Sequence, residues 1–149
     1  VYAVRAIGDV DGDGSDDVLA AIGDNVDTIV CLRGASTNPS GTVLWSYTPG
    51  SPGVRGCAVL PDITGDGVDE LIAVLWTTLG SAIRCRNGAT GAFVWNSSAI
   101  PEYAMAAELL DDITGDGTPE IAVCSWENAV SVLSGADGSL VWKTTVGTA

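Results

Sequence analysis

Short apolar or alternating runs recur along the chain and are separated by clusters of Gly, Asp, Asn and Pro. The runs are rich in Val, Ile, Ala and Thr, which is typical of β-strands bounded by turns, and none has helical periodicity. The pattern therefore predicts twelve short strands in three groups of four. They are Tyr2–Ile7, Val18–Ile22, Thr28–Leu32, Thr42–Tyr47, Val54–Leu60, Leu71–Trp76, Ala82–Arg86, Ala92–Trp95, Ala104–Leu110, Ile121–Trp126, Ala129–Leu133 and Ser139–Thr144.

The chain also repeats itself three times at intervals of about fifty residues. An acidic segment reads DVDGDGSDD, DITGDGVDE and DITGDGTPE, and it begins at Asp9, Asp62 and Asp112. Each acidic segment is followed by a segment that runs from Gly to Trp: GASTNPSGTVLW, GATGAFVW and GADGSLVW. Such self-similarity is the signature of a repeat architecture. We expect a single repeat domain, 1–149, with units at about 1–50, 51–100 and 101–149.

Four-stranded antiparallel units of this length are typical of β-propeller blades, which stack because one sheet cannot cover both of its own faces. We therefore expect an all-β fold of three four-stranded antiparallel propeller-type blades. A closed propeller usually takes about four to eight blades, so three units predict an incomplete or assembling propeller. Further blades or other copies of the chain would complete the ring, or the copies would form an open array. Because the chain opens at Val1 without a Met, we expect it to come from a longer or processed precursor.

The charge balance narrows the function classes. The 149 residues carry 19 Asp and Glu against 6 Lys and Arg, a net charge of -13, which disfavours nucleic acid and anionic membranes and favours cations. The chain has no His, so the commonest general base and metal ligand is missing. No apolar run reaches the roughly 18 residues of a membrane helix. We expect no nucleic-acid binding, no membrane insertion and no intrinsic enzymatic activity.

The acidic segments have the ligand spacing of a site for a hard cation. Oxygen-bearing side chains occupy positions 1, 3, 5 and 9, Gly allows a sharp turn at position 6, and position 7 offers a backbone carbonyl. The expected ligands are Asp9, Asp11, Asp13, the carbonyl of Ser15 and Asp17; Asp62, Thr64, Asp66, the carbonyl of Val68 and Glu70; and Asp112, Thr114, Asp116, the carbonyl of Thr118 and Glu120. The sequence predicts up to three Ca²⁺ ions, one per repeat.

Two other interpretations of these segments are weaker. An EF-hand loop needs a carboxylate at position 12 followed by a helix, whereas position 12 is Ala20, Ala73 or Val123, each inside a predicted strand. Asp and Gly also form ordinary turns, but the same spacing in three units favours calcium. By carboxylate count, four against three in each of the others, the first loop is expected to bind calcium most tightly.

The loop followed by an aliphatic pair (Val18-Leu19, Leu71-Ile72 and Ile121-Ala122) resembles the FG-GAP and VCBS repeats of integrin-α-type β-propellers. This resemblance implies calcium-binding loops between the first two strands of each blade. The segments GATGAFVW and GADGSLVW also resemble the last-strand hairpins of PQQ-type propeller repeats, in which the Trp packs between blades. In the first unit an insertion at 36–40 interrupts this second pattern.

The tryptophans fall into two sets of equivalent positions. Trp45, Trp95 and Trp142 end the Gly-to-Trp segments, and we expect them to pack between blades. Trp76 and Trp126 each follow the first loop Asp by 14 residues. Their indoles either pack or form an exposed platform for a carbohydrate.

The four cysteines, Cys31, Cys57, Cys85 and Cys124, form no CxxC pair, so they do not predict a thiolate metal site. An even number favours disulfides in an oxidising compartment, with buried free thiols as the alternative. Of the three connectivities, we favour Cys31 with Cys57 and Cys85 with Cys124, because both would tie consecutive units.

These observations predict an extracellular, calcium-stabilised structural or adhesive module, secreted or at the cell surface. It would be a subunit of a self-associating assembly or filament, or pair with further blades. One alternative is a lectin-like module with a glycan ligand. The other is a fragment of a calcium-dependent polysaccharide lyase, which needs a basic side chain beside a loop with an open metal position. Glu108, within an apolar strand, is either an additional calcium ligand or a structural carboxylate.

Overall fold

The computed structural model describes residues 1–23, 26–35, 41–50, 53–77, 82–100 and 103–147. The regular secondary structure of these residues consists of β-strands, and none of the described segments is an apolar helix long enough to cross a membrane. The strands are β1 (Ala3–Gly8), β2 (Asp17–Ile22), β3 (Thr28–Leu32), β4 (Val43–Tyr47), β5 (Val54–Leu60), β6 (Glu70–Leu75), β7 (Ile83–Arg86), β8 (Phe93–Asn96), β9 (Ala104–Leu109), β10 (Ile121–Ser125), β11 (Ala129–Leu133) and β12 (Leu140–Thr145).

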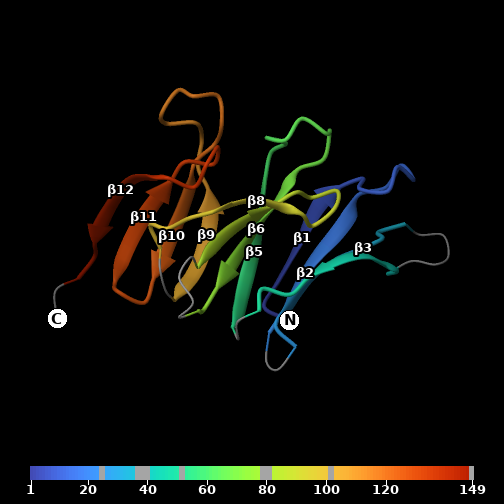
Figure 1. The fold of residues 1–149 in the computed structure, drawn as a ribbon, viewed down its shortest axis with the longest axis horizontal. Coiled ribbons are helices and arrows are strands. Elements are labelled where there is room, and N and C mark those ends of the chain that lie inside the picture. Colours follow the sequence, from blue (N-terminus) through green and yellow to red (C-terminus); the bar gives the residue numbers. More distant parts are fainter. Residues whose placement is uncertain (24–25, 36–40, 51–52, 78–81, 101–102, 148–149) are drawn as a thin grey trace.

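The twelve strands form three separate four-stranded sheets, which confirms the expected all-β, blade-like fold. Sheet A contains β1–β4, sheet B β5–β8 and sheet C β9–β12, and within each sheet every strand pairs antiparallel with the next along the chain. Sheets A and C lie on opposite sides of sheet B, and β5 contacts both β1 and β9 (Figure 1). The spatial order of the sheets is therefore the order of the sequence repeats.

Each sheet has two faces that are equivalent from one repeat to the next. We define the forward face of each sheet by the second residue after the last acid of its loop. This residue is Leu19 in sheet A, Ile72 in sheet B and Ala122 in sheet C. The rear face carries the residue before it, Val18, Leu71 or Ile121. Strand alternation places every second residue of β2, β6 and β10 on the same face as these markers.

The forward face of one sheet packs against the rear face of the next. Between sheets A and B the core includes Leu19, Ala21, Leu71 and Ala73, all inaccessible to solvent. Between sheets B and C, Ile72 and Ile83 of the forward face meet Ile121 and Leu133 of the rear face. Within the described chain, the rear face of sheet A and the forward face of sheet C pack against no further sheet. Apolar burial of this kind is the main force that holds stacked blades together.

Two of the three equivalent tryptophans pack between blades, as expected. The indole N–H of Trp45 donates to the carbonyl of Gly88 in the next blade at 2.8 Å. The indole of Trp95 makes the same bond to Gly135 at 3.0 Å. Trp142, in the last blade, is 43% exposed. Its exposure follows from its position on the forward face of sheet C.

The expected disulfides are not present, because all four cysteines are free thiols. Cys31, Cys57 and Cys85 are buried in the cores between sheets, whereas Cys124 is exposed on the forward face of sheet C. Cys85 faces sheet C from the other side of the blade interface, so Cys124 points away from it. The alternative of free thiols therefore holds, although one of the four is exposed rather than buried.

This arrangement predicts which thiols react. Burial raises the pKa of Cys31 and Cys85 to about 12 and that of Cys57 to about 11, so their reactive thiolates are scarce at neutral pH. In dilute native protein we expect an aromatic disulfide reagent to titrate only Cys124 rapidly, and all four thiols after denaturation without reductant. A denatured protein that shows no free thiol would contradict the assignment.

Candidate metal centres

The three acidic loops lie at the same end of the molecule. They connect β1 to β2, β5 to β6 and β9 to β10, and Figure 1 shows them in blue, green and orange along the upper edge of the sheets. Each loop turns at two glycines with positive φ, at loop positions 4 and 6. At position 6, φ is 90° for Gly14, 87° for Gly67 and 91° for Gly117. Only Gly adopts this conformation without strain, which explains the repeated glycine.

The first Asp of each loop is held by main-chain amides. In the second loop, Asp62 accepts hydrogen bonds from the N–H groups of Gly65 at 2.6 Å and Gly67 at 2.7 Å. The equivalent glycine amides of the first and third loops donate to Asp9 and Asp112 at 2.7–2.9 Å. The hydrogen bond donated by the amide N–H of the glycine at position 6 is the main reason why the pKa values of Asp62 and Asp112 lie below the usual range. These hydrogen bonds thus fix the first ligand of each loop in place, and they favour the ionised form of Asp62 and Asp112.

The last acid of each loop is fully buried at the start of the second strand of its sheet. Asp17, Glu70 and Glu120 have no exposed area. Each accepts an N–H from loop position 2: Val10 at 2.8 Å, Ile63 at 2.9 Å and Ile113 at 2.6 Å, respectively. This bond ties the beginning of the loop to its end.

Each loop brings three carboxylates together. Ligand oxygens from loop positions 1 and 9 and from one further Asp lie within 4.8 Å of one another. The further Asp is Asp11 at position 3 of the first loop, and Asp66 or Asp116 at position 5 of the others. Asp13 is not in the first cluster, in contrast to the predicted ligand set. Such oxygen clusters match the ligand preference of a hard divalent cation.

The other predicted ligands have roles in the loop frame. The Thr64 hydroxyl accepts a hydrogen bond from Asn87 at 3.0 Å, and the Thr114 hydroxyl donates to Glu120 at 2.8 Å. The carbonyls of Ser15, Val68 and Thr118 follow the turning glycine at position 6, as the sequence predicts. Glu108 lies on β9 opposite Ala122 and belongs to none of the clusters found among the described residues.

The second loop contains a buried carboxylate oxygen that no donor satisfies. Glu70 Oε1 accepts the N–H groups of Ile63 and Thr64, both at 2.9 Å, whereas Oε2 is buried without a hydrogen-bond partner. Burial is the main cause that raises the pKa of Glu70 above its ordinary value. An unsatisfied buried oxygen is costly unless a cation or donor meets it. Oε2 is therefore a strong candidate for a metal-ligand atom.

The first loop differs because a cation of the protein already pairs with it. Arg33 forms an ion pair with Asp11, and its Nε lies 3.7 Å from Asp13. Both oxygens of Asp17 accept amide hydrogens, from Val10 and Gly34. In the second unit the position of Arg33 is held by the neutral Asn87, which donates to Asp66 at 2.6 Å. The expectation that the first loop binds calcium most tightly rests on its number of carboxylates and leaves out the positive charge of Arg33, which competes with calcium for them.

Substitution of Arg33→Asn, which copies the second unit, is expected to strengthen calcium binding at the first loop by up to about fivefold, because a partly exposed ion pair is worth at most about 1 kcal/mol. Calorimetric titration of calcium measures the change. Lys143→Asn is the matched control, because Lys143 pairs with Glu127 in blade three and its replacement removes the same charge without touching the first loop. Equal calcium affinity in parent and Arg33→Asn would contradict competition by Arg33.

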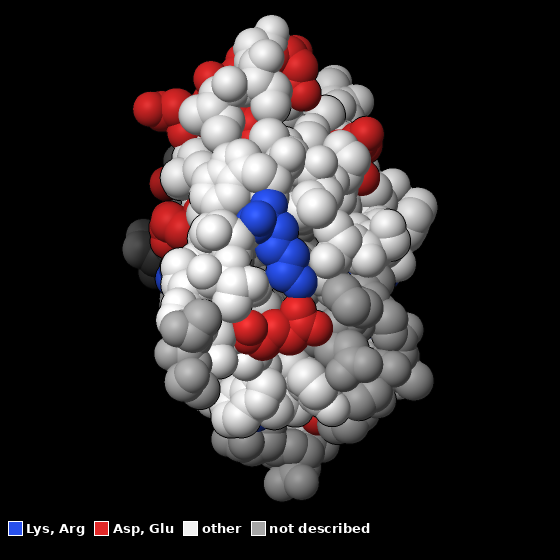
Figure 2. Space-filling model, turned by 90° about the vertical axis from the view of Figure 1, so that its left-hand side faces the viewer, with Lys and Arg blue, Asp and Glu red and all other residues white. Residues whose placement is uncertain are grey.

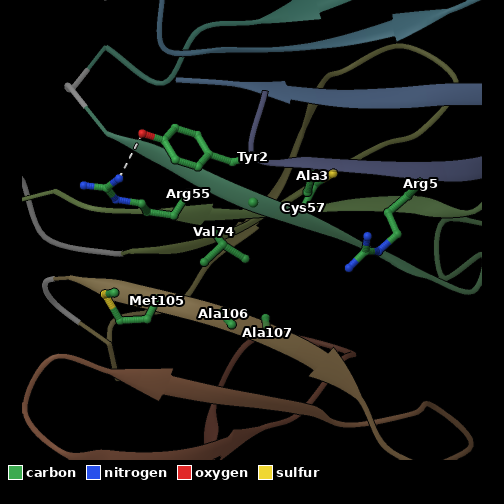
Figure 3. A pocket seen from close by; sticks show the side chains of 10 residues that line it. Tyr2, Ala3, Arg5, Arg55, Cys57, Val74, Met105, Ala106 and Ala107 are labelled. Carbon is green, nitrogen blue, oxygen red and sulfur yellow. Dashed lines mark hydrogen bonds between the residues drawn. The ribbon is translucent and has the colours of Figure 1, made fainter. Parts of the chain in front are cut away.

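A cavity of about 210 Å³ lies where β1, β5 and β9 converge. Figure 3 shows Arg55 directed towards the Tyr2 hydroxyl, with a donated hydrogen bond of 3.2 Å, and Arg5 and Met105 elsewhere on its wall. Arg55 also stacks over the rings of Tyr2 and Trp76. The cavity thus gathers two of the six basic side chains in an acidic chain.

Trp76 and Trp126, the second tryptophan set, contact each other with ring centroids 5.2 Å apart in an edge-to-face arrangement. Trp76 is half-buried and also contacts Tyr103, whereas Trp126 is 64% exposed. Packing and exposure, which the sequence left as alternatives, are thus both present, one in each tryptophan.

Viewed from the side of sheet C, acidic side chains lie at the loop end of the molecule, and a further acidic group lies lower on this face next to a basic side chain (Figure 2). Each of the three acidic motifs forms a carboxylate cluster. The chain matches no family model and no curated protein, so its resemblance to FG-GAP and VCBS repeats rests on the motifs alone.

Proposed function

We propose that this chain is a calcium-stabilised structural or adhesive repeat module that acts outside the cell as a subunit of a self-associating assembly. The observation that carries the proposal is the threefold recurrence of one carboxylate cluster at the same place in each blade. A site that is present once in every blade is better suited to stabilising the blade than to catalysing a reaction. A catalytic site, by contrast, is usually built once per domain.

The chemistry of the loops favours calcium as a folding ligand. Each loop confines three carboxylates within 4.8 Å, and their mutual repulsion opposes closure of the loop until a cation neutralises it. Three Ca²⁺ ions would bring the formal charge from -13 to about -7.

Polysaccharide-lyase chemistry finds less support at the loops. Arg33 is the basic residue beside an acidic cluster, but a guanidinium stays protonated and cannot act as a base. Lys143 pairs at 2.7 Å with Glu127, in the turn at the opposite end of β10 from the acidic loop. A calcium ion at these loops would therefore have no partner suited to abstract a proton among the described basic residues next to it.

Calcium titration by calorimetry tests the proposal directly. We expect close to three ions per chain, with no comparable heat from Mg²⁺, which is smaller and prefers octahedral coordination. A chain that binds fewer than one Ca²⁺ at millimolar concentration would defeat the proposal.

Carbohydrate binding is the second candidate, and the exposed Trp126 favours it. Its indole, the neighbouring Trp76 and the Arg55 stacked on Trp76 offer apolar and cationic contacts to an acidic sugar. Retention on acidic glycan arrays that is lost in Trp126→Ala but kept in Phe93→Ala, which removes another exposed aromatic ring, would support this function. Equal retention of both variants would exclude Trp126 as the platform.

A further inference from the structure

We infer that the cavity between β1, β5 and β9 binds a small aliphatic dicarboxylate, with one carboxylate held by Arg55 and the other by Arg5. The inference goes beyond the calcium function, because the residues that line the cavity lie outside the three acidic loops. It also differs from the carbohydrate candidate, in which a sugar would lie on the exposed indole of Trp126. Arg55 is common to both sites, whereas Trp126 does not line the cavity.

Three blades of one chain form the cavity from equivalent positions. Each blade supplies the same two consecutive positions near the start of its first strand. They are Tyr2 and Ala3, Arg55 and Gly56, and Met105 and Ala106. The first residue of each pair lies seven residues before the first Asp of the acidic loop in the same blade. The position of the cavity is therefore set by the repeat.

Gly56 keeps the space open. A Cβ on Gly56 would lie 3.9 Å from the Cβ atoms of Ala3 and Val74, which is an ordinary contact distance. The φ of Gly56 is not positive, so its backbone conformation does not require glycine. Glycine inside a strand weakens the strand and often marks a place where a ligand approaches closely. The absence of a side chain at this position is therefore explained by the cavity rather than by the backbone.

Arg55 departs from the repeat at this cavity. The pairing of β5 with β6 passes from Val54 directly to Gly56, so Arg55 is the extra residue of a β-bulge. Strand β9 has the equivalent irregularity at Met105. The bulge thus belongs to the repeat, whereas the positive charge occurs in one of the two strands. Because bulges often redirect a side chain beside a functional site, the guanidinium of Arg55 is a candidate for ligand recognition.

The guanidinium of Arg55 is held in place and still has an unused donor. Its Nη1 donates to the Tyr2 hydroxyl at 3.2 Å, and its Cζ lies 5.3 Å from the centroid of the Tyr2 ring and 5.0 Å from that of Trp76. Its Nε is buried without a hydrogen-bond partner. A buried donor without an acceptor costs free energy, and the planar guanidinium matches the geometry of a carboxylate. Arg55 is therefore preorganised to bind a carboxylate.

Arg5 supplies the second positive charge of the cavity. Figure 3 shows its guanidinium on the opposite side of the cavity from that of Arg55. Arg5 is exposed, and it donates to the carbonyl of Val4 at 2.9 Å. In the described part of the chain the ion pairs are formed by Arg33 and Lys143, and neither Arg5 nor Arg55 pairs with a carboxylate. In a chain with 19 acidic residues, two such guanidinium groups at one cavity indicate a site for an anion from outside the chain.

A mostly apolar wall separates the two arginines. Cys57 and Val74 lie between them in Figure 3, and no acidic side chain is among the described residues that line the cavity. The volume of about 210 Å³ equals that of roughly seven molecules of liquid water at about 30 Å³ each, which suits a short carbon chain rather than an oligosaccharide. Guanidinium groups pair with carboxylates in a planar, two-pronged geometry. A positive group at each end and an apolar middle therefore match an aliphatic dicarboxylate.

Calorimetric titration in saturating calcium tests the site with succinate, adipate and suberate, which differ in chain length. At least one of the three is expected to bind with one molecule per chain. It should bind at least about tenfold more tightly than the monocarboxylate of the same chain length, which is butyrate, hexanoate or octanoate, because only the dicarboxylate reaches both arginines. The inference would be overturned if none of the three dicarboxylates bound saturably at millimolar concentration, or if each bound no better than its monocarboxylate.

Two charge variants that copy other blades test the arginines. Arg55→Met introduces the residue of the third blade, and Arg5→Ala introduces the residue of the second, which is Ala58. Each is expected to weaken binding of the best dicarboxylate at least about tenfold and to remove most of its advantage over the monocarboxylate. Lys143→Asn is the control, because it removes the same charge outside the cavity. An equal loss in Lys143→Asn would mean that net charge alone attracts the anion.

Gly56→Leu tests the cavity without changing the charge. The Leu side chain would occupy the space that the ligand needs, so the variant is expected to fold but to lose dicarboxylate binding. Gly56→Ala is the matched control and should retain binding, since its Cβ fits at 3.9 Å from its neighbours. Trp126→Ala should also bind like the parent, which separates this site from the carbohydrate candidate. Dicarboxylate binding that persists in Gly56→Leu would show that the ligand lies elsewhere.

Calcium titration of the same variants keeps this inference separate from the calcium function. Their acidic loops are unchanged, so each variant is expected to bind calcium like the parent. A parent that binds calcium but no dicarboxylate would remove this site and leave the calcium function standing. A parent that binds a dicarboxylate but no calcium would do the reverse.

Discussion

Chelation of calcium is expected to lower the melting temperature by roughly 15 to 30 °C, because three sites each saturated at about 100 times their Kd contribute about 8 kcal/mol together and one kcal/mol shifts a domain of this size by about 2–4 °C. The sites should act together, since the middle blade packs against both neighbours through continuous apolar cores. Differential scanning calorimetry with and without chelator measures the effect.

The control for this experiment is re-addition of either calcium or magnesium after chelation. Calcium is expected to restore the original transition, whereas magnesium should restore little of it. The effect should also be larger at low than at high salt, because salt screens the repulsion among the emptied carboxylates. An unchanged melting curve after chelation would show that the loops close without a metal.

Substitution of Glu70→Gln is expected to have opposite effects in the two states of the protein. With calcium bound, loss of the Oε2 ligand should cost about 3 kcal/mol, which is the contribution of one well-saturated site. Without calcium, the variant should be as stable as the parent or more stable, because it removes a buried carboxylate with an unsatisfied oxygen. Chemical denaturation at both calcium levels gives the two free energies of unfolding.

The pH dependence of the calcium-free comparison has a defined sign. Burial raises the pKa of Glu70 in the folded state, so the ionised carboxylate destabilises the fold at neutral pH, and this penalty declines as the pH falls through the raised pKa. The free energies of unfolding of the parent and Glu70→Gln should therefore converge as the pH approaches 4.5, the ordinary pKa of a Glu side chain, because the carboxylate then becomes protonated in both the folded and the unfolded state.

Asp69→Asn is the matched control, because Asp69 lies next to Glu70 but outside the cluster. A loss of calcium-bound stability in Asp69→Asn as large as that in Glu70→Gln would mean that net charge, not ligation, explains the effect.

The fold was predictable because local patterns and the repeat agree. Alternating Val, Ile and Ala runs determine each strand, and the repeat determines that four consecutive strands make a unit. The boundaries shift by a residue or so, as at β8, which begins at Phe93 rather than Ala92. The pairing of β7 with β8 also has a register irregularity between Cys85 and Arg86, and the sequence alone does not reveal such irregularities.

The candidate metal site was predictable in its spacing but not in its local competition. The positions of Asp62, Asp66 and Glu70 follow from the motif. Arg33 was missed because it lies 16 residues beyond the end of its loop and reaches the cluster only through the β3–β4 hairpin. The signal that pointed to it was available: the position before the recurring hairpin Gly is Arg in one repeat and Asn or Ser in the others.

The expected pairing of Cys85 with Cys124 failed because the two thiols lie on different sides of sheet C, whereas Cys31 and Cys57 share the core between sheets A and B as free thiols. Sequence spacing suggested ties between consecutive units, but the face on which a residue lies follows from strand alternation. Cys124 is on the same type of face as Val74, so it points away from the preceding blade and away from Cys85. A count of residues from the loop acid would have assigned these faces in advance.

The spatial order of the sheets also has a consequence for the gene. Every sheet is completed by its own four consecutive strands, and no strand from one end of the described chain enters a sheet at the other. In-frame duplication of one unit of about fifty codons would therefore add one blade with one ready-made junction and leave both end surfaces as they were. Blade number is free to change by duplication or deletion of whole units, without compensating substitutions at the existing junctions.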